Sequence, residues 1–478
     1  MPDPWRKRVE VGEAVLYTGD VLEVLATLPE ESVHTVVTSP PYWGLRDYGT
    51  GTWEGGNAEC DHKMPIPKGG TSTLTNWAGT SEAQEKYAEK LKGTISYRDI
   101  CGKCGARRID AQIGLESTPE EYVAKMVEVF RAVRRVLRKD GTLWLNLGSS
   151  YAGSGKGPSN SIQPDASCIG NMRGMNPLEG TPTEWIPTPP GFKPKDMIPI
   201  PWMVAMALQA DGWYLRSDII WSKPNPMPES VTDRPTKAHE YLFLLSRSPK
   251  YYYDAEAIKE GAISGTDLGL LRGRDAGGDD STTVAWHVKS IADRQADGVN
   301  SRTANPSGTR NRRTVWTIAT EPYPEAHFAT FPRKLVQPCI LAGCPEHACP
   351  KCGAPWVRDI EHGEPVSTDG TKADYRSPKM DASMSDARIK GRSDGWTPNH
   401  MRPSRTTGEH PTCTCGLPAI GGTCLDPFGG SGTTAEVALE YGRRAILIEL
   451  KPEYVELARN RITPVAGRPM LAFTGVAT

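Results

Sequence analysis

Four consecutive residues, Ser39, Pro40, Pro41 and Tyr42, have the chemistry to hold a planar ring that carries an amino group. They directly follow the apolar run VHTVVT, which has the composition of a buried strand. Because proline fixes φ and has no N–H, the carbonyl oxygens of Ser39 and Pro40 would remain as acceptors at the end of that strand. Two accepted hydrogen bonds would orient an amino nitrogen as a nucleophile, and Tyr42 would stack on the ring. The alternative is a proline-rich strand exit with an aromatic side chain packed beneath it.

A second motif lies near the other end of the chain, in the sequence DPFGGSGTT from Asp426 to Thr434. It follows an apolar strand and opens a helix, where glycine lets the backbone approach a ligand and the first N–H groups are unpaired. The spacing matches neither the dinucleotide pattern G-x-G-x-x-G nor a phosphate loop with G-K-[ST]. Glu449 ends the next strand, where a carboxylate can accept both ribose hydroxyls. The pair favours a nucleoside whose second half is not a phosphate. A tight turn and a surface glutamate are the alternative.

Most of the eleven cysteines occur in short pairs. An odd number in a long chain does not fit a secreted disulfide scaffold, whereas C-x-x-C and C-x-C pairs are typical of metal sites in reducing compartments. Two groups of four ligands result: Cys60, His62, Cys101 and Cys104, and Cys349, Cys352, Cys413 and Cys415. Each is the pattern of a closed structural zinc site, and zinc would let a poorly hydrophobic insertion fold. Long gaps separate the pairs, so scattered free thiols are the alternative.

The elements that must position these motifs alternate between strands and helices. Strand-like runs occur at 14–20 and 33–39, with the helical run VLEVLATLP between them. A capping box of Thr118 and Glu121 opens a further helix, which we expect to end at Gly141, before the strand GTLWLNLG. The chain closes on strand, helix, strand and helix. Near-continuous apolar strands indicate a parallel sheet with helices on both faces, so we expect both motifs at its carboxyl edge.

Composition and charge narrow the class of protein further. Lys and Arg number 56 against 57 Asp and Glu, a net charge of -1, so any contact with nucleic acid must come from a local basic surface. No window approaches the roughly 20 apolar residues of a membrane span, and the charged start has no apolar signal core. We therefore expect a cytoplasmic protein without a membrane partner. The 48 glycines and 41 prolines cluster in stretches without periodicity, which indicates long insertions.

Together, the two motifs resemble those of the DNA amino-methyltransferases, the N4-cytosine and N6-adenine DNA methyltransferase family. That family joins an F-x-G-x-G motif, which binds S-adenosyl-L-methionine (AdoMet), to a [DNS]-P-P-[YF] motif. Here the Pro-Pro motif comes first, which is similar to the circularly permuted β group of the family. The resemblance implies a Rossmann-like sheet of seven strands and methyl transfer to double-stranded DNA, with the target base flipped out of the duplex. In a restriction-modification setting, it also implies a cognate endonuclease as partner.

The resemblance covers the α/β parts of the chain and leaves the insertions outside it. We expect a catalytic core at 1–50, 114–255, 314–343 and 419–478, in which 314–343 closes over the cofactor and 419–478 binds it. Zinc-binding insertions are expected at 51–113 and 344–418. The polar, glycine-rich segment 256–313 predicts a basic flexible loop. Its four clustered arginines, which either contact DNA phosphates or are simply solvated, are Arg302, Arg310, Arg312 and Arg313.

The roles of the family's residues carry over only to matching positions. The resemblance implies that Ser39, Pro40, Pro41 and Tyr42 form the catalytic loop. It implies that AdoMet is lined by Phe428, Gly429, Gly430 and Gly432, with Asp426 near its amino-acid part and Glu449 on the ribose. Asp20 would approach the adenine ring, or else cap the helix that follows it. Phe331 lies in HFATFPRKLV, which resembles the segment that closes over the methionine end of the cofactor.

The first residue of the Pro-Pro motif favours one target atom. Ser39 favours cytosine N4, since adenine-N6 enzymes more often have Asp or Asn there; adenine N6 is the alternative. Cytosine-C5 chemistry would need a Cys nucleophile, but Cys339, which follows Pro338, lies in an apolar run that predicts a packed helix. Two further alternatives are a methyltransferase for RNA or protein glutamine, and a non-catalytic zinc-dependent DNA-binding protein.

Overall fold

The chain divides into two compact units. The computed structural model describes residues 7–44, 51–57, 59–65, 94–96, 100–110, 112–152, 188–229, 231–261, 309–321, 331–363, 366–367, 400–401 and 404–467. The first unit comprises Met1–Tyr253, Thr314–Glu346 and Gly421–Thr478, and the second comprises Asp254–Arg313 and His347–Ile420. Each unit is therefore assembled from segments that lie far apart in the sequence.

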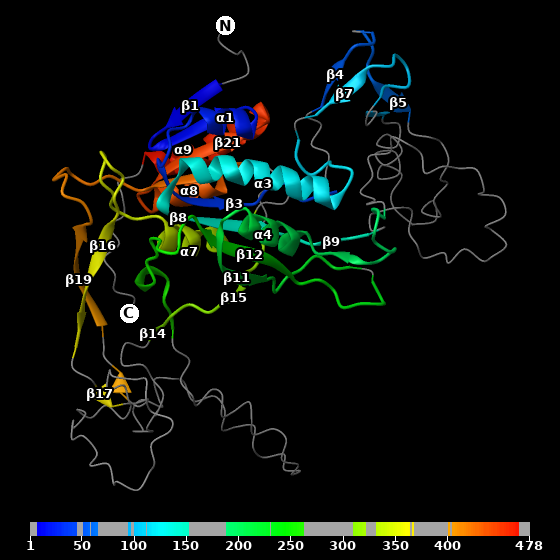
Figure 1. Cartoon of the computed structure of the whole chain (residues 1–478). Coiled ribbons are helices and arrows are strands. Elements are labelled where there is room, and N and C mark those ends of the chain that lie inside the picture. The colour runs from blue at the N-terminus through cyan, green and yellow to red at the C-terminus, as the bar shows by residue number, and fades with distance from the viewer. Residues whose placement is uncertain are drawn as a thin grey trace, which may run out of the picture. The chain divides into compact units, whose positions relative to one another are not determined.

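A nine-stranded sheet forms the centre of the first unit, in the order β1-β2-β21-β20-β3-β8-β12-β11-β15 (Figure 1). Its strands are β1 (Lys7–Val11), β2 (Ala14–Thr18), β21 (Arg444–Glu449), β20 (Thr423–Asp426), β3 (Val33–Thr38), β8 (Leu137–Leu147), β12 (His239–Ser246), β11 (Tyr214–Ser222) and β15 (Val315–Thr317). The strands from β2 to β8 are parallel, whereas β12 is antiparallel to both β8 and β11. The expected Rossmann-like sheet of seven strands, β2 to β11, is confirmed, and β1 and β15 extend it at its two edges.

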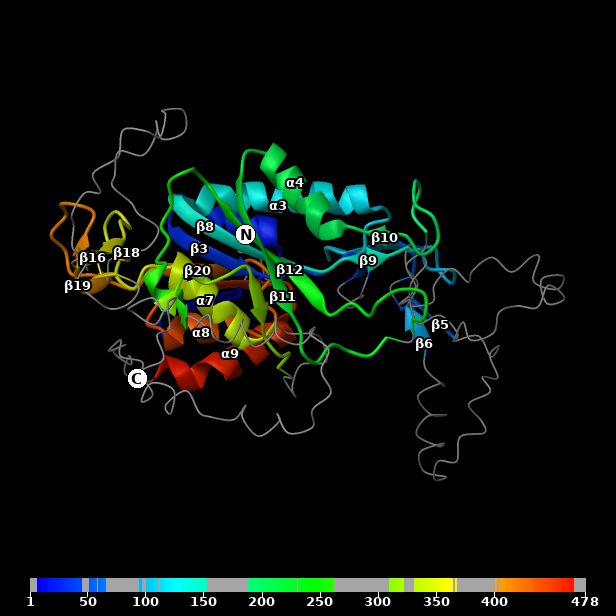
Figure 2. The same ribbon diagram turned by 90° about the horizontal axis from the view of Figure 1, so that it is seen from below.

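Helices cover both faces of this sheet (Figure 2). On one face lie α1 (Val21–Thr27), α3 (Pro119–Val136) and α4 (Ile200–Ala210), and on the other lie α7 (Arg333–Gly343), α8 (Thr433–Glu440) and α9 (Pro452–Ala466). Because both faces are covered, β3 is buried along its whole length. This explains why its sequence shows no alternation of polar and apolar residues.

Local sequence determines the start of α3, and tertiary packing determines its end. The expected capping box is formed: Thr118 Oγ1 accepts from Glu121 N at 3.2 Å, and the Glu121 carboxylate accepts from Thr118 N at 3.3 Å. The helix ends at Val136, so the predicted end at Gly141 is wrong. Leu137 starts β8 instead, where it is fully buried and pairs with Val33. Burial in the sheet outweighs the preference of these residues for continuing the helix.

The main hydrophobic core lies between the sheet and the layer of α1, α3 and α4. One face of α3 contributes Tyr122, Met126, Phe130 and Val133, all fully buried, at the spacing of an amphipathic helix. Burying a large apolar side chain stabilises a fold by about 1.5–3 kcal/mol. This packing fixes the ends of the central strands, where both motifs lie.

Shorter pairs of strands lie outside the central sheet. In the first unit, β4 (Thr52–Glu54) pairs with β7 (Arg107–Ile109), β5 (Lys63–Pro65) with β6 (Thr94–Ser96), and β9 (Ser150–Tyr151) with β10 (Met197–Ile198). The second unit contains η3 (Glu256–Ile258) and the pairs β13 (Glu260–Gly261) with β14 (Thr309–Arg310), β16 (Trp356–His362) with β19 (Ser404–Pro411), and β17 (Val366–Ser367) with β18 (His400–Met401). Among the described residues, no helix is long and apolar enough to cross a membrane.

Two of the four clustered arginines are engaged within the second unit. Arg310 and Arg313 each form an ion pair with Glu260, at 2.8 and 2.6 Å. Arg302 lies outside the described residues. The shared carboxylate neutralises part of the positive charge that the sequence places in this segment, so a role of the segment in phosphate binding stays a prediction.

Candidate active site

The Pro-Pro and glycine motifs lie at the carboxyl ends of two adjacent parallel strands. The Pro-Pro motif follows β3, the glycine turn follows β20, and these two strands pair with each other. The Thr38 hydroxyl donates to Asp426 Oδ1 at 2.7 Å, across 388 positions of sequence. The two ends of the chain thus form one edge of the sheet, which is where open α/β sheets bind their ligands.

Asp426 is a buried carboxylate at the centre of this edge, with 1% of its surface exposed. Its Oδ1 accepts from Thr38 and from the backbone N–H of Phe428, and its Oδ2 accepts from the Thr434 hydroxyl at 2.7 Å. Burial raises the pKa of Asp426 to about 6, although these hydrogen bonds act to lower it. The carboxylate therefore ties β20 to β3 and α8. A place beside the amino-acid part of a cofactor stays a prediction.

The glycine turn packs closely against neighbouring protein. A Cβ at Gly429 would lie 2.7 Å from Leu447 Cδ2, and one at Gly432 would lie 2.8 Å from Ala458 Cβ in α9. Gly432 also has a φ of 83°, in the left-handed region that disfavours side chains. These glycines let the chain turn tightly from β20 into α8, so that the unpaired N–H groups of the helix start lie at the sheet edge.

Glu449, at the end of β21, is oriented by the same turn. Its Oε2 accepts from Gly430 N and its Oε1 accepts from Lys451 N, both at 2.9 Å. Burial raises the pKa of Glu449 to about 6. Each carboxylate oxygen can accept a further hydrogen bond. The side chain is thus held in place and can still bind hydroxyl groups.

Asp20 follows the neighbouring strand β2, where Gly19 N donates to Glu449 O at 3.0 Å. The Asp20 side chain caps α1, since its Oδ1 accepts from Leu22 N at 2.9 Å and from Glu23 N at 3.2 Å. The helix cap considered from the sequence is therefore formed. A contact of Asp20 with an adenine ring stays a prediction.

The two aromatic residues expected at the cofactor are both half-buried. Phe428 packs against the main core from the glycine turn, and Phe331 lies just before α7. Residues 322–330 of the expected closing segment, which include the first four residues of HFATFPRKLV, lie outside the described residues. Arg333 opens α7 and forms an ion pair with Glu440 of α8, so the two helices lie side by side. Cys339 is fully buried in α7, as expected for a packed thiol.

The loop with the Pro-Pro motif is held by residues that precede or begin α3. The Tyr122 hydroxyl donates to Pro41 O at 2.9 Å, and Trp43 Nε1 donates to Glu116 O at 2.9 Å. Trp43 itself is 2% exposed. Because the loop is fixed on both sides of Tyr42, the position of this aromatic ring is fixed as well.

A polar network around Tyr42 was not predicted from the sequence. The Tyr42 hydroxyl lies 2.7 Å from Glu240 Oε2 and 3.1 Å from Asn146 Oδ1, which also accepts from the Ser39 hydroxyl at 3.2 Å. Lys223 forms an ion pair with Glu240. Burial and the charge of Glu240 raise the pKa of Tyr42, so the phenol stays protonated and acts as a donor. The network connects the first and last residues of the Pro-Pro motif to β8, to β12 and to Lys223, which directly follows β11.

The only local signal for this network is a polar residue inside an apolar run. Asn146 lies near the end of the strand LWLNL and is 1% exposed, and its Nδ2 donates to Tyr241 O at 3.0 Å. A buried amide of this kind needs partners. The sequence indicates that Asn146 needs hydrogen-bond partners, but it does not identify the network, because Tyr42 and Glu240 are separated by 198 positions.

Both predicted groups of metal ligands are assembled. Within each group, all four ligand atoms lie within 4.8 Å of one another. The Sγ atoms of Cys60 and Cys101 are 3.8 Å apart, as are those of Cys352 and Cys415. These distances are far longer than the roughly 2.05 Å of a disulfide bond. The cysteines are therefore arranged around a common point without being bonded in pairs.

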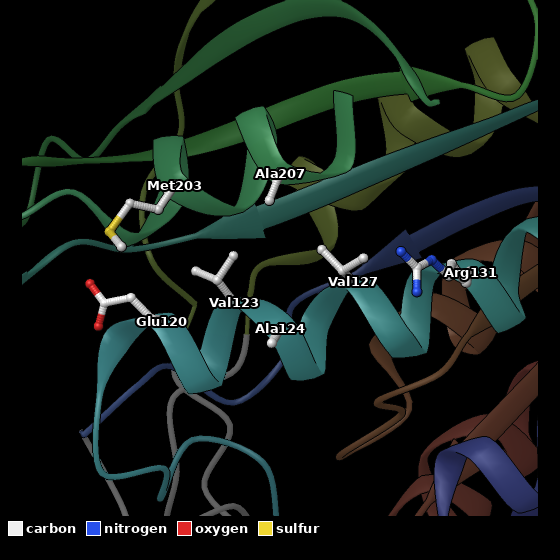
Figure 3. Close-up of a pocket in the computed structure, with 7 residues that line it drawn as sticks. All are labelled: Glu120, Val123, Ala124, Val127, Arg131, Met203 and Ala207. Carbon is white, nitrogen blue, oxygen red and sulfur yellow. The ribbon is translucent and has the colours of Figure 1, made fainter. Parts of the chain in front are cut away.

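A surface groove lies between α3 and α4 (Figure 3). It is lined by Glu120, Val123, Ala124, Val127, Arg131, Met203 and Ala207. These side chains belong to the two helices on one face of the sheet, and none comes from the Pro-Pro loop or the glycine turn. The groove has no group suited to methyl transfer, and we assign it no part in the chemistry.

Comparison with known proteins identifies the family. Residues 33–349 and 412–460, which include both motifs, match the family model described as DNA methylase, covering N6 and N4 methyltransferases. The chain belongs to this DNA methylase family.

Two relatives are similar over nearly the whole chain. The Type II methyltransferase M.Cfr9I of Citrobacter freundii is 33% identical over 454 residues, which cover 95% of this chain and 89% of the relative. The Type II methyltransferase M.SmaI of Serratia marcescens is 33% identical over 447 residues, which cover 94% of this chain and 90% of the relative. The solved structure of the PvuII DNA methyltransferase (cytosine-N4-specific) aligns over 97% of this chain and 96% of its own, with 14% identity and a TM-score of 0.41.

Proposed function

We propose that the protein transfers a methyl group from AdoMet to an exocyclic amino group of a base in double-stranded DNA. The observation that carries the proposal is the hydrogen bond from Thr38 to Asp426 at 2.7 Å, which fixes the Pro-Pro motif beside the glycine turn. Methyl transfer needs donor and acceptor in contact, and holding both at one sheet edge provides that. Membership of the DNA methylase family supports the same reaction.

The glycine turn fits the chemistry of AdoMet. Glu449 is a fixed carboxylate with room for two accepted hydrogen bonds, which suits the ribose hydroxyls. We infer that Phe428, Gly429, Gly430 and Gly432 line the cofactor, with Asp20 toward the adenine ring, Asp426 near the amino-acid part and Phe331 at the methionine end. When bound, AdoMet supplies an electrophilic methyl group on a sulfonium.

The role of the Pro-Pro loop is to hold and orient the target base. The carbonyl oxygens of Ser39 and Pro40 accept the two amino hydrogens, which orients the nitrogen lone pair toward the methyl donor. Pro41 keeps the loop rigid, and Tyr42 stacks on the base. Since the amino group of a paired base is not accessible in this way, the base leaves the duplex. As the new N–C bond forms, the bond between sulfur and the methyl carbon would break with its electron pair staying on sulfur as a neutral thioether, and the nitrogen would release one proton to solvent.

Ser39 favours cytosine N4 as the target atom. Its hydroxyl donates to Asn146, which leaves the hydroxyl oxygen and the carbonyl oxygen of Ser39 as acceptors near the amino group. Adenine N6 is the alternative with the same fold and mechanism. The names of the Type II relatives further support a restriction-modification role in the cytoplasm, with a cognate endonuclease as partner.

Replacing residues of the Pro-Pro loop tests the proposal. In Pro40→Ala or Tyr42→Ala, methyl transfer to duplex DNA should fall by about a hundredfold or more, because the base is no longer held in position. Binding of AdoMet, measured by calorimetry, should be retained, since the glycine turn is unchanged. Full activity in either variant would contradict the assignment.

We also infer that each group of four cysteine and histidine ligands binds a structural zinc ion. Four protein ligands complete a tetrahedral site and leave no position for water or substrate. Neither site therefore takes part in methyl transfer itself.

A further inference from the structure

Three pairs of ligand atoms, two in the first group and one in the second, have the separations that tetrahedral zinc requires. Zn–S bonds of about 2.3 Å and a Zn–N bond of about 2.0 Å place two sulfurs about 3.8 Å apart, and a sulfur and a nitrogen about 3.5 Å apart. The Sγ atoms of Cys60 and Cys101 are 3.8 Å apart, and Cys104 Sγ lies 3.5 Å from His62 Nδ1. In the second group, the Sγ atoms of Cys352 and Cys415 are also 3.8 Å apart.

Both groups are built on the same backbone turn. The sequences CGKCGA, at 101–106, and CPKCGA, at 349–354, each contain one C-x-x-C pair. In each, the N–H of the first Cys donates to the carbonyl of the Ala five positions later, at 2.8 and 2.9 Å, and the Gly N–H donates back to the first Cys carbonyl at 2.8 Å. The two glycines have φ values of 73° and 66°. The turn therefore presents two thiols to one point, and it occurs twice among the described residues.

The described part of the first insertion has almost no hydrophobic core of its own. In the described part of residues 51–110, the buried hydrophobic residues are Cys101 and Ala106. So small a core does not hold a fold together, and small modules of this kind usually depend on a metal or disulfides. Since Cys60, Cys101 and Cys104 form no disulfide, we infer that a metal holds the described part of this module together.

A series of contacts leads from the first metal site back to the α/β core. The turn at 101–106 runs into β7, where Arg108 forms an ion pair with Asp110 at 2.6 Å. The two side chains are 7% and 13% exposed, so solvent screens this pair weakly. Asp110 Oδ1 also accepts from Gln112 N at 3.0 Å.

These contacts end at the Pro-Pro loop. Gly44 N donates to Gly114 O at 2.8 Å, which closes the base of the insertion immediately after the loop. Gly114 has a φ of 101°, and a Cβ on it would lie 2.9 Å from Tyr42 O. The returning segment therefore packs directly on the backbone of Tyr42.

We propose that the first zinc centre, formed by Cys60, His62, Cys101 and Cys104, positions the Pro-Pro loop, whereas the second centre stabilises only its own unit. The metal stabilises the insertion, the insertion positions Asp110 and residues 112–114, and these residues position Tyr42 and Gly44. The importance of this positioning for catalysis rests on the proposed function, in which the Pro-Pro loop holds the target base. The presence of the metal and the rigidity of the loop can both be measured without methyl transfer.

The test combines metal analysis with hydrogen–deuterium exchange on the full-length protein. The wild type should contain two zinc ions per chain. His62→Ala should retain one after dialysis against a chelator, and its Gly44 amide should exchange about tenfold faster or more, because that hydrogen bond opens more often. His62→Cys gives the first group four cysteine ligands in one C-x-C and one C-x-x-C pair, as in the second group. This variant should therefore keep two zinc ions, and its Gly44 amide should exchange as slowly as in the wild type.

Two further variants distinguish positioning from general loss of structure. Cys352→Ala should also retain one zinc ion but leave exchange at Gly44 unchanged, since it alters only the second unit. Asp110→Asn should keep both zinc ions and still speed exchange at Gly44, because it cuts the series of contacts without removing a ligand. A wild-type protein without bound zinc, or wild-type exchange at Gly44 in His62→Ala or Asp110→Asn, would overturn the proposal.

Discussion

At the scale of single residues, Tyr42 joins the fold to the proposed chemistry. Its ring is the surface on which we expect the base to stack, and its hydroxyl belongs to a buried network with Asn146 and Glu240. These two parts of the side chain have different roles. The hydroxyl positions the ring, and the ring contacts the base.

Tyr42→Phe separates the two roles. It keeps the ring but removes the donor, so the free energy of unfolding should fall by about 1–2 kcal/mol. Methyl transfer should stay within about tenfold of the wild type, in contrast to Tyr42→Ala. Denaturant unfolding and initial rates of methyl incorporation measure both effects. If Tyr42→Phe were as inactive as Tyr42→Ala, stacking would not be the function of this residue.

The buried carboxyl of Asp426 makes stability depend on pH. The pKa of Asp426 is about 6 in the folded protein, whereas an aspartate that is not buried has a pKa of 3.8. The folded state therefore binds the proton more tightly than the unfolded state does. The resulting stabilisation is fully present below about pH 4 and is lost as the pH rises through about 6. Glu449 shifts in the same direction. Asp426→Asn cannot titrate, so its loss of stability between pH 4 and 7 should be smaller, by up to about 3 kcal/mol. Urea unfolding at several pH values measures this, and an unchanged pH dependence would contradict the burial argument.

At the scale of secondary structure elements, the junction of β20 and α8 depends on Gly432. Alanine there would adopt an unfavourable left-handed conformation and also contact Ala458 in α9 at 2.8 Å. Gly432→Ala should therefore lower the free energy of unfolding by about 3 kcal/mol and weaken AdoMet binding. Gly191→Ala is the matched control. Gly191 has a similar φ of 86°, and no described heavy atom lies within 4 Å of an added Cβ, so we expect a cost of about 1 kcal/mol. Equal losses in the two variants would show that contact with α9 is unimportant.

Some secondary structure elements could be predicted from the sequence, and others could not. The strands that lead into both motifs, and the capping box at Thr118, were predictable because their signals lie within a few neighbouring residues. The end of α3 at Val136 was not, since pairing of Leu137 with Val33 decides it. The edge strands β1 and β15 were missed for the same reason. At the site, Asp20 and Ser39 could be singled out by motif, but Glu240 could not, because its contact with Tyr42 exists only after folding.

At the scale of the whole molecule, the two motifs are far apart in the chain and adjacent in the sheet. We propose that the interruptions between them are inserted modules on one α/β core, with 51–113 and 344–418 each organised around zinc. The order of the motifs then has no effect on the chemistry, because parallel strands bring their carboxyl ends to one edge whatever their order in the sequence.

We propose that this edge of the sheet methylates an exocyclic amino group in DNA. The proposal is tested by incubating the protein with AdoMet and unmethylated duplex DNA, digesting the DNA to nucleosides and identifying the products by mass spectrometry. We predict N4-methylcytidine in its deoxy form, with a yield from Tyr42→Ala that is lower by about a hundredfold or more. N6-methyladenine would shift the target base but keep the mechanism. Methylation at cytosine C5, or no methylated base from an AdoMet-binding protein on DNA of varied sequence, would contradict the account.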